Sequence, residues 1–367
     1  MNAPHGRSEG AFAPLGGAGA QRRRGAHTNA PHGRSEGAFA PLGGAGAQRR
    51  RGGTTMNARV VISEFMDEQA VDALRGEFDV LYQPALVDDL TALRSALAQA
   101  QALIVRNRTR VDASLLAAAP GLRVVGRLGV GLDNIDVQAC RGRDIRVIPA
   151  LGANAQAVAE YVVAAAMMLL RGAYASSVEV AAGGWPRAAL SDGLEIGGKV
   201  LGLVGFGDIG RRTARLAQAV GMRVLAHDPA LSADSAVWAE AGVGRRDLEG
   251  LLGECDVLSL HVPLNAATRG LIDAARLGRM RPQAVLINTA RGGVVDEAAL
   301  AQALREGRLA GAALDVFEHE PLGAGSALAG VPRLLLTPHI AGVTRESNVR
   351  VSSMIAEQVG AALRELG

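Results

Sequence analysis

The sequence predicts an α/β protein of two domains, each a doubly wound parallel sheet, with an interdomain cleft. Short apolar runs alternate with helical patterns along most of the 367 residues, and such alternation is typical of parallel βαβ units. A long alanine-rich helical segment at about 155–171 divides the alternation into two series. At 49% hydrophobic residues, the chain can bury a core in each domain.

Each series contains five apolar runs that we interpret as strands. The first has RVVISE (59–64), DVLYQ (79–83), ALIVR (102–106), RVVGRLG (123–129) and RVIPA (146–150). The second has KVLGLVGFG, RVLAHD, VLSLHV, AVLINT and LLLTPH. The final stretch, 343–366, has the apolar spacing of an amphipathic helix. It lies too late in the chain to extend the second sheet.

The first 55 residues differ in composition from the rest. Residues 2–25 recur identically at 29–52, with a 27-residue period rich in Gly, Ala, Pro and Arg. Large apolar side chains are too few to offset the entropy of ordering. We expect a disordered repeat tail over 1–55, with Met56 as the functional start, and a nucleic-acid-binding arm as the alternative.

Charge and cysteine usage exclude several classes of function. The tail carries eight Arg against two Glu, or +6, so the net charge of +3 leaves −3 for the remainder. This argues against a nucleic-acid partner of the fold. Cys140 and Cys255 lack metal-ligand spacing, which predicts no metal and a reducing cytoplasm. The apolar stretch 162–170 is too short to cross a membrane, and we interpret it as a buried helix.

A glycine-rich turn predicts the cofactor site. GFGDIG places Gly205, Gly207 and Gly210 between a strand and a helix, and Asp228 closes the next strand. This context is that of a Rossmann-like dinucleotide site, where pyrophosphate meets the helix N-terminus. Asp228 can bind ribose hydroxyls and would repel a 2′-phosphate, which favours NAD over NADP. Asp208 lies close to the expected phosphates, so we expect it to face solvent or to pair with Arg211 or Arg212.

Three side chains just past predicted strand ends suit hydride transfer at a 2-hydroxy or 2-keto acid. The reaction needs a cation for carboxylate and carbonyl, a proton donor and acceptor, and a group that orients the donor. Arg291 in NTARGGVVDE, Glu320 in GAALDVFEHEP and His339 in LLLTPHIAG meet these needs. Spacing alone leaves a structural role for His339 open.

From Arg59 to the end, the chain resembles the D-2-hydroxyacid dehydrogenase family, which includes phosphoglycerate, glycerate and hydroxypyruvate enzymes. The matching stretches are GRLGVGLDNID (126–136), GLVGFGDIG, INTARGGVVDE, GAALDVFEHEP and LTPHIAG, in family order. The resemblance implies that Arg291 holds substrate carboxylate and carbonyl, that His339 is the general acid and base, and that Glu320 supports the His. A carboxylate beside imidazole stabilises the imidazolium that gives a proton during reduction.

The same resemblance implies the remaining organisation of the molecule. Residues 56–154 and 340–367 form a flavodoxin-like substrate-binding domain, and 155–339 form the Rossmann domain for NAD, with hinges near Asn154 and Ile340. A homodimer through the cofactor domain is expected, with the 155–171 helix as a contributor. Backbone amides of Val130 and Gly131 bind the substrate carboxylate. The implied cofactor-binding residues are Gly205, Phe206, Gly207, Asp208, Ile209, Gly210, Asp228, Val262, Pro263, Thr268, Thr289, Ala290, Asp315 and Gly342. Asp315 and Asp296 otherwise read as loop acids.

The segment IVRNRTRV bears on the substrate. If it stays extended, Arg106, Arg108 and Arg110 face one way and form a basic wall for a second anionic group, with Arg127 as a fourth member. Of these, Arg106 matches a substrate-side position of the family. Solvated surface arginines are the alternative. The opening ISEFMDE, with LIVRNRT and GRLGVGLDNID, resembles the sulfolactate dehydrogenase branch most.

Other functions remain open from the sequence. A 3-phosphoglycerate-type acid is a candidate substrate beside 3-sulfolactate, and a glyoxylate or hydroxypyruvate reductase is the alternative enzyme. Corepressors related to the family share its fold, sense NADH and bind partner peptides, so fold alone does not establish turnover. Formate or phosphite oxidation is a further alternative. Formate enzymes carry a Gln beside the acid/base His, which LTPHIAG lacks.

Overall fold

A computed structural model of the chain describes residues 58–366. The predicted repeat tail over 1–55 lies outside these residues. The described chain contains two separate parallel sheets, one of five strands and one of seven, so the predicted fold class is confirmed.

The first sheet has the order β2-β1-β3-β4-β5. Its strands are β1 (Arg59–Ile62), β2 (Asp79–Tyr82), β3 (Ala102–Val105), β4 (Val124–Arg127) and β5 (Arg146–Pro149), and its helices are α1 (Glu68–Arg75), α2 (Leu90–Leu97), α3 (Ala113–Ala117) and α4 (Val137–Arg141). A short 3-10 helix spans Pro84–Asp88. The strand order reverses between β1 and β3, and in such sheets the crevice beyond the strands at this switch point is the usual ligand site.

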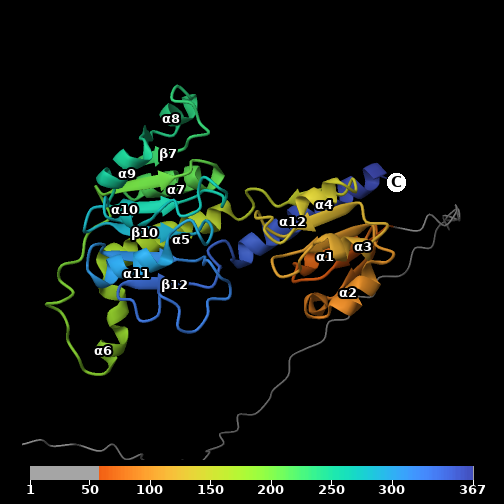
Figure 1. The fold of residues 1–367 in the computed structure, drawn as a ribbon, viewed down its shortest axis with the longest axis horizontal. Helices are drawn as coiled ribbons and strands as arrows, with labels where there is room; N and C mark the ends of the chain where they lie inside the picture. The colour runs from red at the N-terminus through yellow and green to blue at the C-terminus, as the bar shows by residue number, and fades with distance from the viewer. Residues whose placement is uncertain (1–57, 367) are drawn as a thin grey trace, which may run out of the picture. The chain divides into compact units, whose positions relative to one another are not determined.

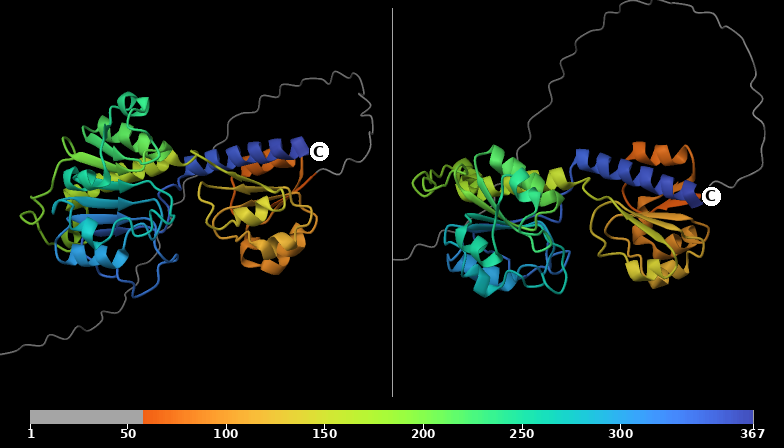
Figure 2. Two further views of the ribbon diagram at one scale, coloured as in Figure 1. Left: turned by 45° about the horizontal axis from the view of Figure 1, so that its top comes forward. Right: turned by 90° about the horizontal axis from the view of Figure 1, so that it is seen from above.

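The last helix, α12 (Arg345–Leu366), returns to the first sheet. Its buried side chains, among them Val351, Ile355 and Val359, share one core with β1 and β3. The backbone of β4 at Gly126 approaches so closely that an added Cβ would lie 2.7 Å from Val359 and 2.9 Å from Ile355. Figures 1 and 2 show α12 beside α1, from the opposite end of the described chain. The amphipathic pattern in the sequence therefore belongs to this core.

The second sheet has the order β12-β11-β10-β9-β6-β7-β8, with its switch point between β6 and β9. The strands are β6 (Val200–Val204), β7 (Arg223–His227), β8 (Gly244–Arg245), β9 (Val257–Leu260), β10 (Val285–Asn288), β11 (Gly311–Leu314) and β12 (Leu334–Leu336). The helices are α5 (Ala155–Arg171), α6 (Ser177–Ala181), α7 (Asp208–Ala219), α8 (Ala236–Glu240), α9 (Leu248–Glu254), α10 (Ala274–Leu277) and α11 (Glu297–Arg305), with a 3-10 turn at Ala173–Ser176.

Alternate residues of β6 divide the second sheet between two cores. Leu201 and Leu203 pack with α5 and α7, whereas Val200 and Val204 pack with α9, α10 and α11. Both faces are covered, which explains why the strands read as continuous apolar runs. Within residues 58–366, seven helices begin after an aspartate whose side chain accepts a backbone N–H of the first turn. Such N-caps stabilise the start of a helix. Asp296 is one of these caps, on α11, in line with its reading as a loop acid.

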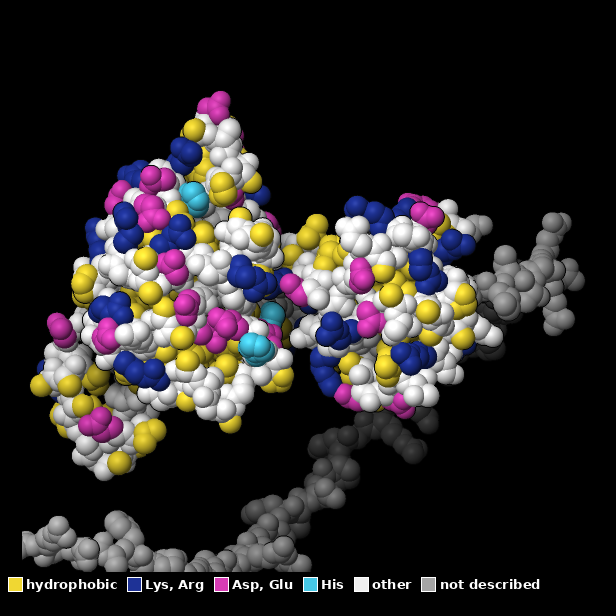
Figure 3. Space-filling model, viewed as in Figure 1, with side chains coloured by type: hydrophobic (Ala, Val, Ile, Leu, Met, Phe, Trp, Pro, Cys, Tyr) yellow, Lys and Arg dark blue, Asp and Glu magenta, His cyan; other side chains and the backbone are white. Residues whose placement is uncertain are grey.

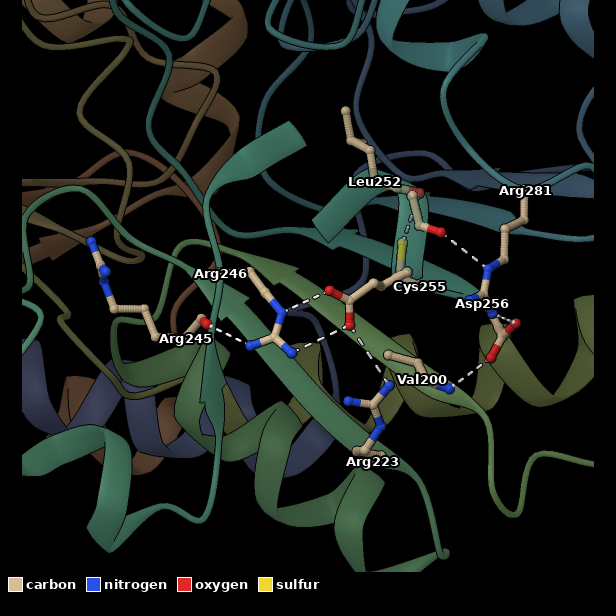
Figure 4. Close-up of polar contacts among 10 residues, drawn as sticks. Val200, Arg223, Arg245, Arg246, Leu252, Cys255, Asp256 and Arg281 are labelled. Atoms are coloured by element: carbon tan, nitrogen blue, oxygen red, sulfur yellow. Dashed lines mark hydrogen bonds and ion pairs between the residues drawn. The ribbon is translucent and has the colours of Figure 1, made fainter. Parts of the chain in front are cut away.

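Asp256 fastens the amino ends of two central strands of the second sheet. Its side chain is almost fully buried. One carboxylate oxygen accepts the backbone N–H of Val200 at 2.8 Å, and the other pairs with Arg281 at 3.1 Å (Figure 4). Arg281 also donates to the carbonyl of Gly253. The contact joins β6, the end of α9 and the segment before β10.

Three further features of the described residues concern surface charge, helices that could cross a membrane, and clusters that could hold a metal. On the face that Figure 3 shows, basic and acidic side chains of the described residues are interspersed. Within 58–366, no single helix has the length and apolarity to cross a membrane; α5 with the following Ala173–Ala181 segment passes that test only as a pair bent by 71°. No group of three or more His, Cys, Asp or Glu in the described part of the chain could hold a metal ion.

Candidate active site

The turn after β6 has the steric features of a dinucleotide site. Gly205 has φ +95°, and a Cβ there would collide with the carbonyl of His261 after β9. A Cβ at Gly210 would press on the carbonyl of Gly205, so this glycine lets α7 pack against the turn. A Cβ at Gly207, the N-cap of α7, would meet open space. The backbone N–H groups of the first turn of α7 are thus open to a phosphate.

Asp228 follows β7 and faces this turn. One of its carboxylate oxygens accepts the N–H of Phe206 at 2.7 Å and the other accepts that of Ala230 at 2.9 Å. Each oxygen keeps a lone pair for a further donor such as a ribose hydroxyl. Asp208 pairs with Arg212 one helical turn on, at 3.3 Å, as one of the two sequence-based expectations had it. Its charge is partly balanced along the surface of α7.

A histidine and a glutamate meet beyond the ends of β11 and β12. The Nδ1 atom of His339 lies 2.8 Å from the Oε2 atom of Glu320. The other oxygen of Glu320 accepts the N–H of Phe317, which fixes the carboxylate. Because an ionised carboxylate only accepts, the pair favours a proton on Nδ1 and leaves Nε2 for exchange with a substrate.

Asp315, at the end of β11, holds the backbone that carries His339. Its buried carboxylate accepts the hydroxyl of Thr337 at 2.6 Å and the N–H groups of Ile340 and Ala341, both at 2.8 Å. The carbonyl of Asp315 accepts the N–H of His339, which has φ +55°. An uncommon backbone conformation at a histidine is thus secured by a set of directed hydrogen bonds.

Arg291 follows β10 and reaches toward the loop that carries Gly131. Its Nε atom donates to Asp133 at 3.0 Å, and its Nη1 atom donates to the carbonyl of the preceding residue, Ala290, at 2.6 Å. A Cβ at Gly131 would overlap the guanidinium, so glycine is required for this approach.

Two further arginines come from adjacent strand ends, since Val105 and Arg127 are partners in the β3–β4 register. Arg106 donates to Asn348 of α12 at 2.6 Å and lies over the ring of Phe65. Burial lowers the pKa of Arg106, and Glu64 opposes that shift. Burial, together with Arg291 and Arg106, lowers the pKa of Arg127 to about 10. The buried Nε atom of Arg127 has no partner in the described structure, although Nη1 donates to the carbonyl of Leu128.

The predicted wall of Arg106, Arg108 and Arg110 is wrong. The strand ends at Val105, and the backbone turns because the N–H groups of the next residues bond to Glu64 and not to a neighbouring strand. Arg108 pairs with Asp88 on the surface, and Arg110 is exposed. Of the four arginines predicted to form the wall, Arg106 and Arg127 line the same cleft.

A cleft of about 560 Å³ gathers side chains from both sheets. Of the residues predicted for the site, it is lined by Arg106, Arg127, Val130, Gly131, Ile209, Val262, Pro263, Thr289, Ala290, Arg291, Asp315, His339 and Gly342. Others do not line it: Gly205, Phe206, Gly207, Asp208, Gly210, Asp228, Thr268 and Glu320. Most of these residues lie in the glycine-rich turn or contact it. Glu320 contacts His339, which does line the cleft. Thr268 instead bonds the carbonyl of Pro263.

Comparison with known proteins places this arrangement in a family. The NAD-binding domain of the D-isomer specific 2-hydroxyacid dehydrogenases matches residues 163–341. The chain is 57% identical over 304 residues to an (S)-sulfolactate dehydrogenase of Chromohalobacter salexigens, covering 83% of this chain and 98% of that protein. The chain belongs to the D-isomer specific 2-hydroxyacid dehydrogenase family.

Other relatives broaden the family context of this dehydrogenase. A D-3-phosphoglycerate dehydrogenase of Archaeoglobus fulgidus is 36% identical over 82% of the chain, which spans only 56% of that protein. A solved structure from Thermus thermophilus aligns with TM-score 0.74 and 35% identity over 84% of this chain and 97% of that one. A glyoxylate reductase structure from Paecilomyes thermophila aligns with TM-score 0.74 and 28% identity, over 84% and 96%. The predicted family, enzyme class and NAD-binding domain are confirmed.

Several residues of the cleft in this dehydrogenase were missed by the sequence analysis. Asn348, on α12, contacts Arg106 from 242 residues away, and no local pattern marks it. Asp133 lies in the quoted stretch GRLGVGLDNID, but its pairing with Arg291 depends on how the two sheets' loops meet. Phe65, Asn107, His261 and Val343 also line the cleft. Proximity to the matched stretches was the available signal for most of them.

Proposed function

We propose that this dehydrogenase oxidises a 2-hydroxy acid that carries a second anionic group, of the 3-sulfolactate type. The observation that carries the proposal is that Arg106, Arg127 and Arg291 line one cleft. A single carboxylate balances one guanidinium, and burying further unpaired charge is costly. A sulfonate between Arg106 and Arg127 would balance one of their charges, with Glu64 offsetting part of the rest, and would supply a partner for the buried Nε atom of Arg127. The 57% identity to an (S)-sulfolactate dehydrogenase supports the same substrate.

The stereochemical descriptor of that relative is consistent with a D-specific family. In sulfolactate the carbon bearing sulfur outranks the carboxyl carbon in priority, whereas in glycerate the carboxyl carbon outranks the hydroxymethyl carbon. The (S) label therefore describes the same arrangement of hydroxyl, carboxylate and side chain at C2 as the D label of glycerate. We expect this dehydrogenase to act on (S)-3-sulfolactate and to leave the (R) form.

In the proposed mechanism, Arg291 binds the substrate carboxylate and the C2 oxygen, and Nε2 of neutral His339 takes the hydroxyl proton. Glu320, 2.8 Å from Nδ1, stabilises the imidazolium that results. Backbone amides of Val130 and Gly131 bind the carboxylate from the other side. NAD supplies the hydride acceptor. Closure of the cleft would exclude water from the reacting carbon.

We assign NAD to the turn after β6, where the open space at Gly207 and the first turn of α7 fit a pyrophosphate. Asp228 would bind the ribose hydroxyls. The other proposed contacts are Gly205, Phe206, Asp208, Ile209, Gly210, Val262, Pro263, Thr268, Thr289, Ala290, Asp315 and Gly342. Because Asp315 already accepts three hydrogen bonds, its main contribution would be to hold the His339 backbone near the nicotinamide.

We further propose the domain boundaries 56–154 with 340–367 for substrate and 155–339 for NAD. The shared core of α12 and the first sheet supports them. A homodimer through the second sheet's domain is supported by exposed apolar side chains after α5. A cytoplasmic location is supported by two buried, unpaired cysteines. No nucleic-acid or membrane partner is proposed.

A substrate panel tests the proposed function. Initial rates with NAD are compared for (S)-3-sulfolactate, 3-phosphoglycerate, glycerate and lactate, and rates with NADH for glyoxylate and hydroxypyruvate. We expect kcat/KM for 3-sulfolactate to exceed that for lactate by about 100-fold or more, since each of the two contacts with Arg106 and Arg127 contributes about 1.5–3 kcal/mol. A preference for lactate, glycerate or glyoxylate would contradict the second anion and favour the glyoxylate or hydroxypyruvate reductase alternative.

The roles of the catalytic residues are tested by substitution. His339→Gln should lower kcat by about 10²–10⁴-fold, the usual contribution of a positioned acid/base, and leave the Kd of NADH unchanged. His319→Gln is the matched control, since His319 is exposed and lies beside Glu320 in the chain. Equal losses in both variants would show that His339 acts through the fold of this loop and not through proton transfer.

A further inference from the structure

Glu64 is a buried carboxylate beside the substrate cleft to which the proposed chemistry gives no role. It lies just after β1, is 5% exposed, and faces the end of β3 at the switch point of the first sheet. One oxygen accepts the backbone N–H groups of Arg106 at 2.8 Å and Thr109 at 2.9 Å. The other accepts those of Arg108 at 3.1 Å and Asn107 at 3.3 Å.

These four contacts form the turn that follows β3. The turn is irregular, so its N–H groups have no strand partner, and leaving them unpaired while buried would be costly. Asn134 complements Glu64, because its side-chain amide donates to the carbonyls of Thr109 at 2.7 Å and Arg106 at 3.3 Å. The hydroxyl oxygens of Ser63 and Thr109 form a further hydrogen bond at 2.9 Å. The backbone of 106–109 is therefore fixed by side chains alone.

The turn determines where the Arg106 side chain starts. With its N–H held by Glu64 and its carbonyl by Asn134, Arg106 projects its guanidinium into the cleft, where it meets Asn348. Glu64 is also a negative charge that favours the charged forms of Arg106 and Arg127, against the effect of burial. A neutral group in place of Glu64 would remove the acceptors that shape the turn. It would also remove the negative charge that favours the charged forms of the two arginines.

We propose that Glu64 is the positioning residue of the substrate side of the cleft. Its carboxylate shapes the 106–109 turn and so aims Arg106 at the second anionic group of the substrate. The proposal rests on the proposed function, because Arg106 is assigned to that anion there. Glu64 itself does not touch the reacting atoms. It acts through Arg106, so it should affect recognition of the dianion and leave the hydride-transfer step largely intact.

Glu64→Gln is the direct test, because glutamine keeps the size but places an NH₂ group against two backbone donors. We expect the KM for 3-sulfolactate and 3-phosphoglycerate to rise about 10- to 100-fold, the usual effect of losing a charged hydrogen-bond partner, with kcat within about threefold. The KM for lactate should change less than about threefold. Glu68→Gln, four residues on at the exposed start of α1, removes the same charge and should match wild type.

Two further readouts make the result decisive. Hydrogen exchange of the amides of 106–109 should speed up in Glu64→Gln and not in Glu68→Gln, and the Kd of NADH, which binds at the second sheet, should be equal in all three proteins. Unchanged amide exchange, or equal KM changes for lactate and the dianions, would overturn the proposal. If wild type shows no preference for dianions, the proposed function fails, and the exchange data alone decide whether Glu64 holds the turn.

Discussion

At the residue scale, Asp228 carries the charge that a 2′-phosphate would meet. Asp228→Asn removes the charge and keeps one of the two acceptors, so its oxygen can still accept the N–H of Phe206 while its NH₂ group faces the N–H of Ala230. We expect kcat/KM with NAD to fall about 10-fold or more and the ratio of NADP to NAD use to rise about 10- to 100-fold, since a hydrogen bond to a charged group contributes about 1.5–3 kcal/mol. Steady-state rates with both cofactors measure this. An unchanged ratio would mean that the ribose does not meet Asp228.

His261 lies beside the same turn, and its titration should make stability depend on pH. Burial lowers the pKa of His261 to about 4, from an ordinary value of about 6.5. Between these values the unfolded chain binds a proton that the folded chain does not, so stability falls as pH falls. The loss should reach about 2 kcal/mol at pH 5 and at most about 3 kcal/mol near pH 4.

Urea unfolding from pH 7.5 to 4.5 of wild type and His261→Asn measures this contribution. The variant lacks the titrating group, so its curve should be flatter by that amount. Parallel curves would show that other groups cause the acid sensitivity.

Sequence and structure agree best where chemistry is local. The glycine positions of the cofactor turn follow from contacts within one strand-turn-helix unit, so a single motif predicts them. Glu64, Asn134 and Asn348 could not be found in this way. They bond to backbone or side chains 25 to 242 residues distant, and their partners depend on which strand ends adjoin in the sheet.

At the scale of elements, short apolar runs predicted the core strands but not where they end. Extension of the third strand through Arg110 failed because a buried carboxylate competes for the backbone N–H groups after Val105. β8 went undetected because it is two residues long at a sheet edge, where little apolar surface is required. β11 was recognised only through the stretch GAALDVFEHEP, since its small residues give a weak strand signal.

The Asp256 contact makes a prediction at the same scale. Asp256→Ala would leave the N–H of Val200 and the Arg281 side chain without their acceptor, which should destabilise by about 2–4 kcal/mol. Asp256→Asn keeps one acceptor and should lose about 1 kcal/mol. The urea midpoint of unfolding measures both.

The control for the Asp256 variants is Glu306→Ala. It breaks a solvent-exposed pair with Arg308 at the end of α11, and such pairs contribute little. A midpoint for Asp256→Ala no lower than that of Glu306→Ala would show that the β6–β9 junction does not depend on the carboxylate.

At the scale of the whole molecule, the return of α12 to the first sheet ties the chain's last described helix to its first strands. Two separate chain segments therefore build the substrate side of the cleft, with Arg106 from one and Asn348 from the other. The late amphipathic pattern in the sequence predicted the helix, and the family resemblance predicted that it packs against the first sheet. Periodicity alone could not identify the core against which the helix packs, because it shows only that one face of the helix is apolar.

The proposed homodimer gives a prediction at this largest scale. After α5 one short segment of the chain exposes Trp185 (77%), Val178 (82%) and Tyr174 (62%), and several exposed large apolar side chains on one segment favour an interface there. Light scattering across a concentration series should give twice the chain mass for wild type. The double variant Val178→Asp with Trp185→Asp should be monomeric, because a buried tryptophan at an interface commonly contributes about 2 kcal/mol or more and the added charges would repel. Leu90→Asp, which places the same charge on an exposed apolar site of α2, should remain a dimer. A monomeric wild type would refute the proposed homodimer, and a dimeric double variant would place its interface on another surface.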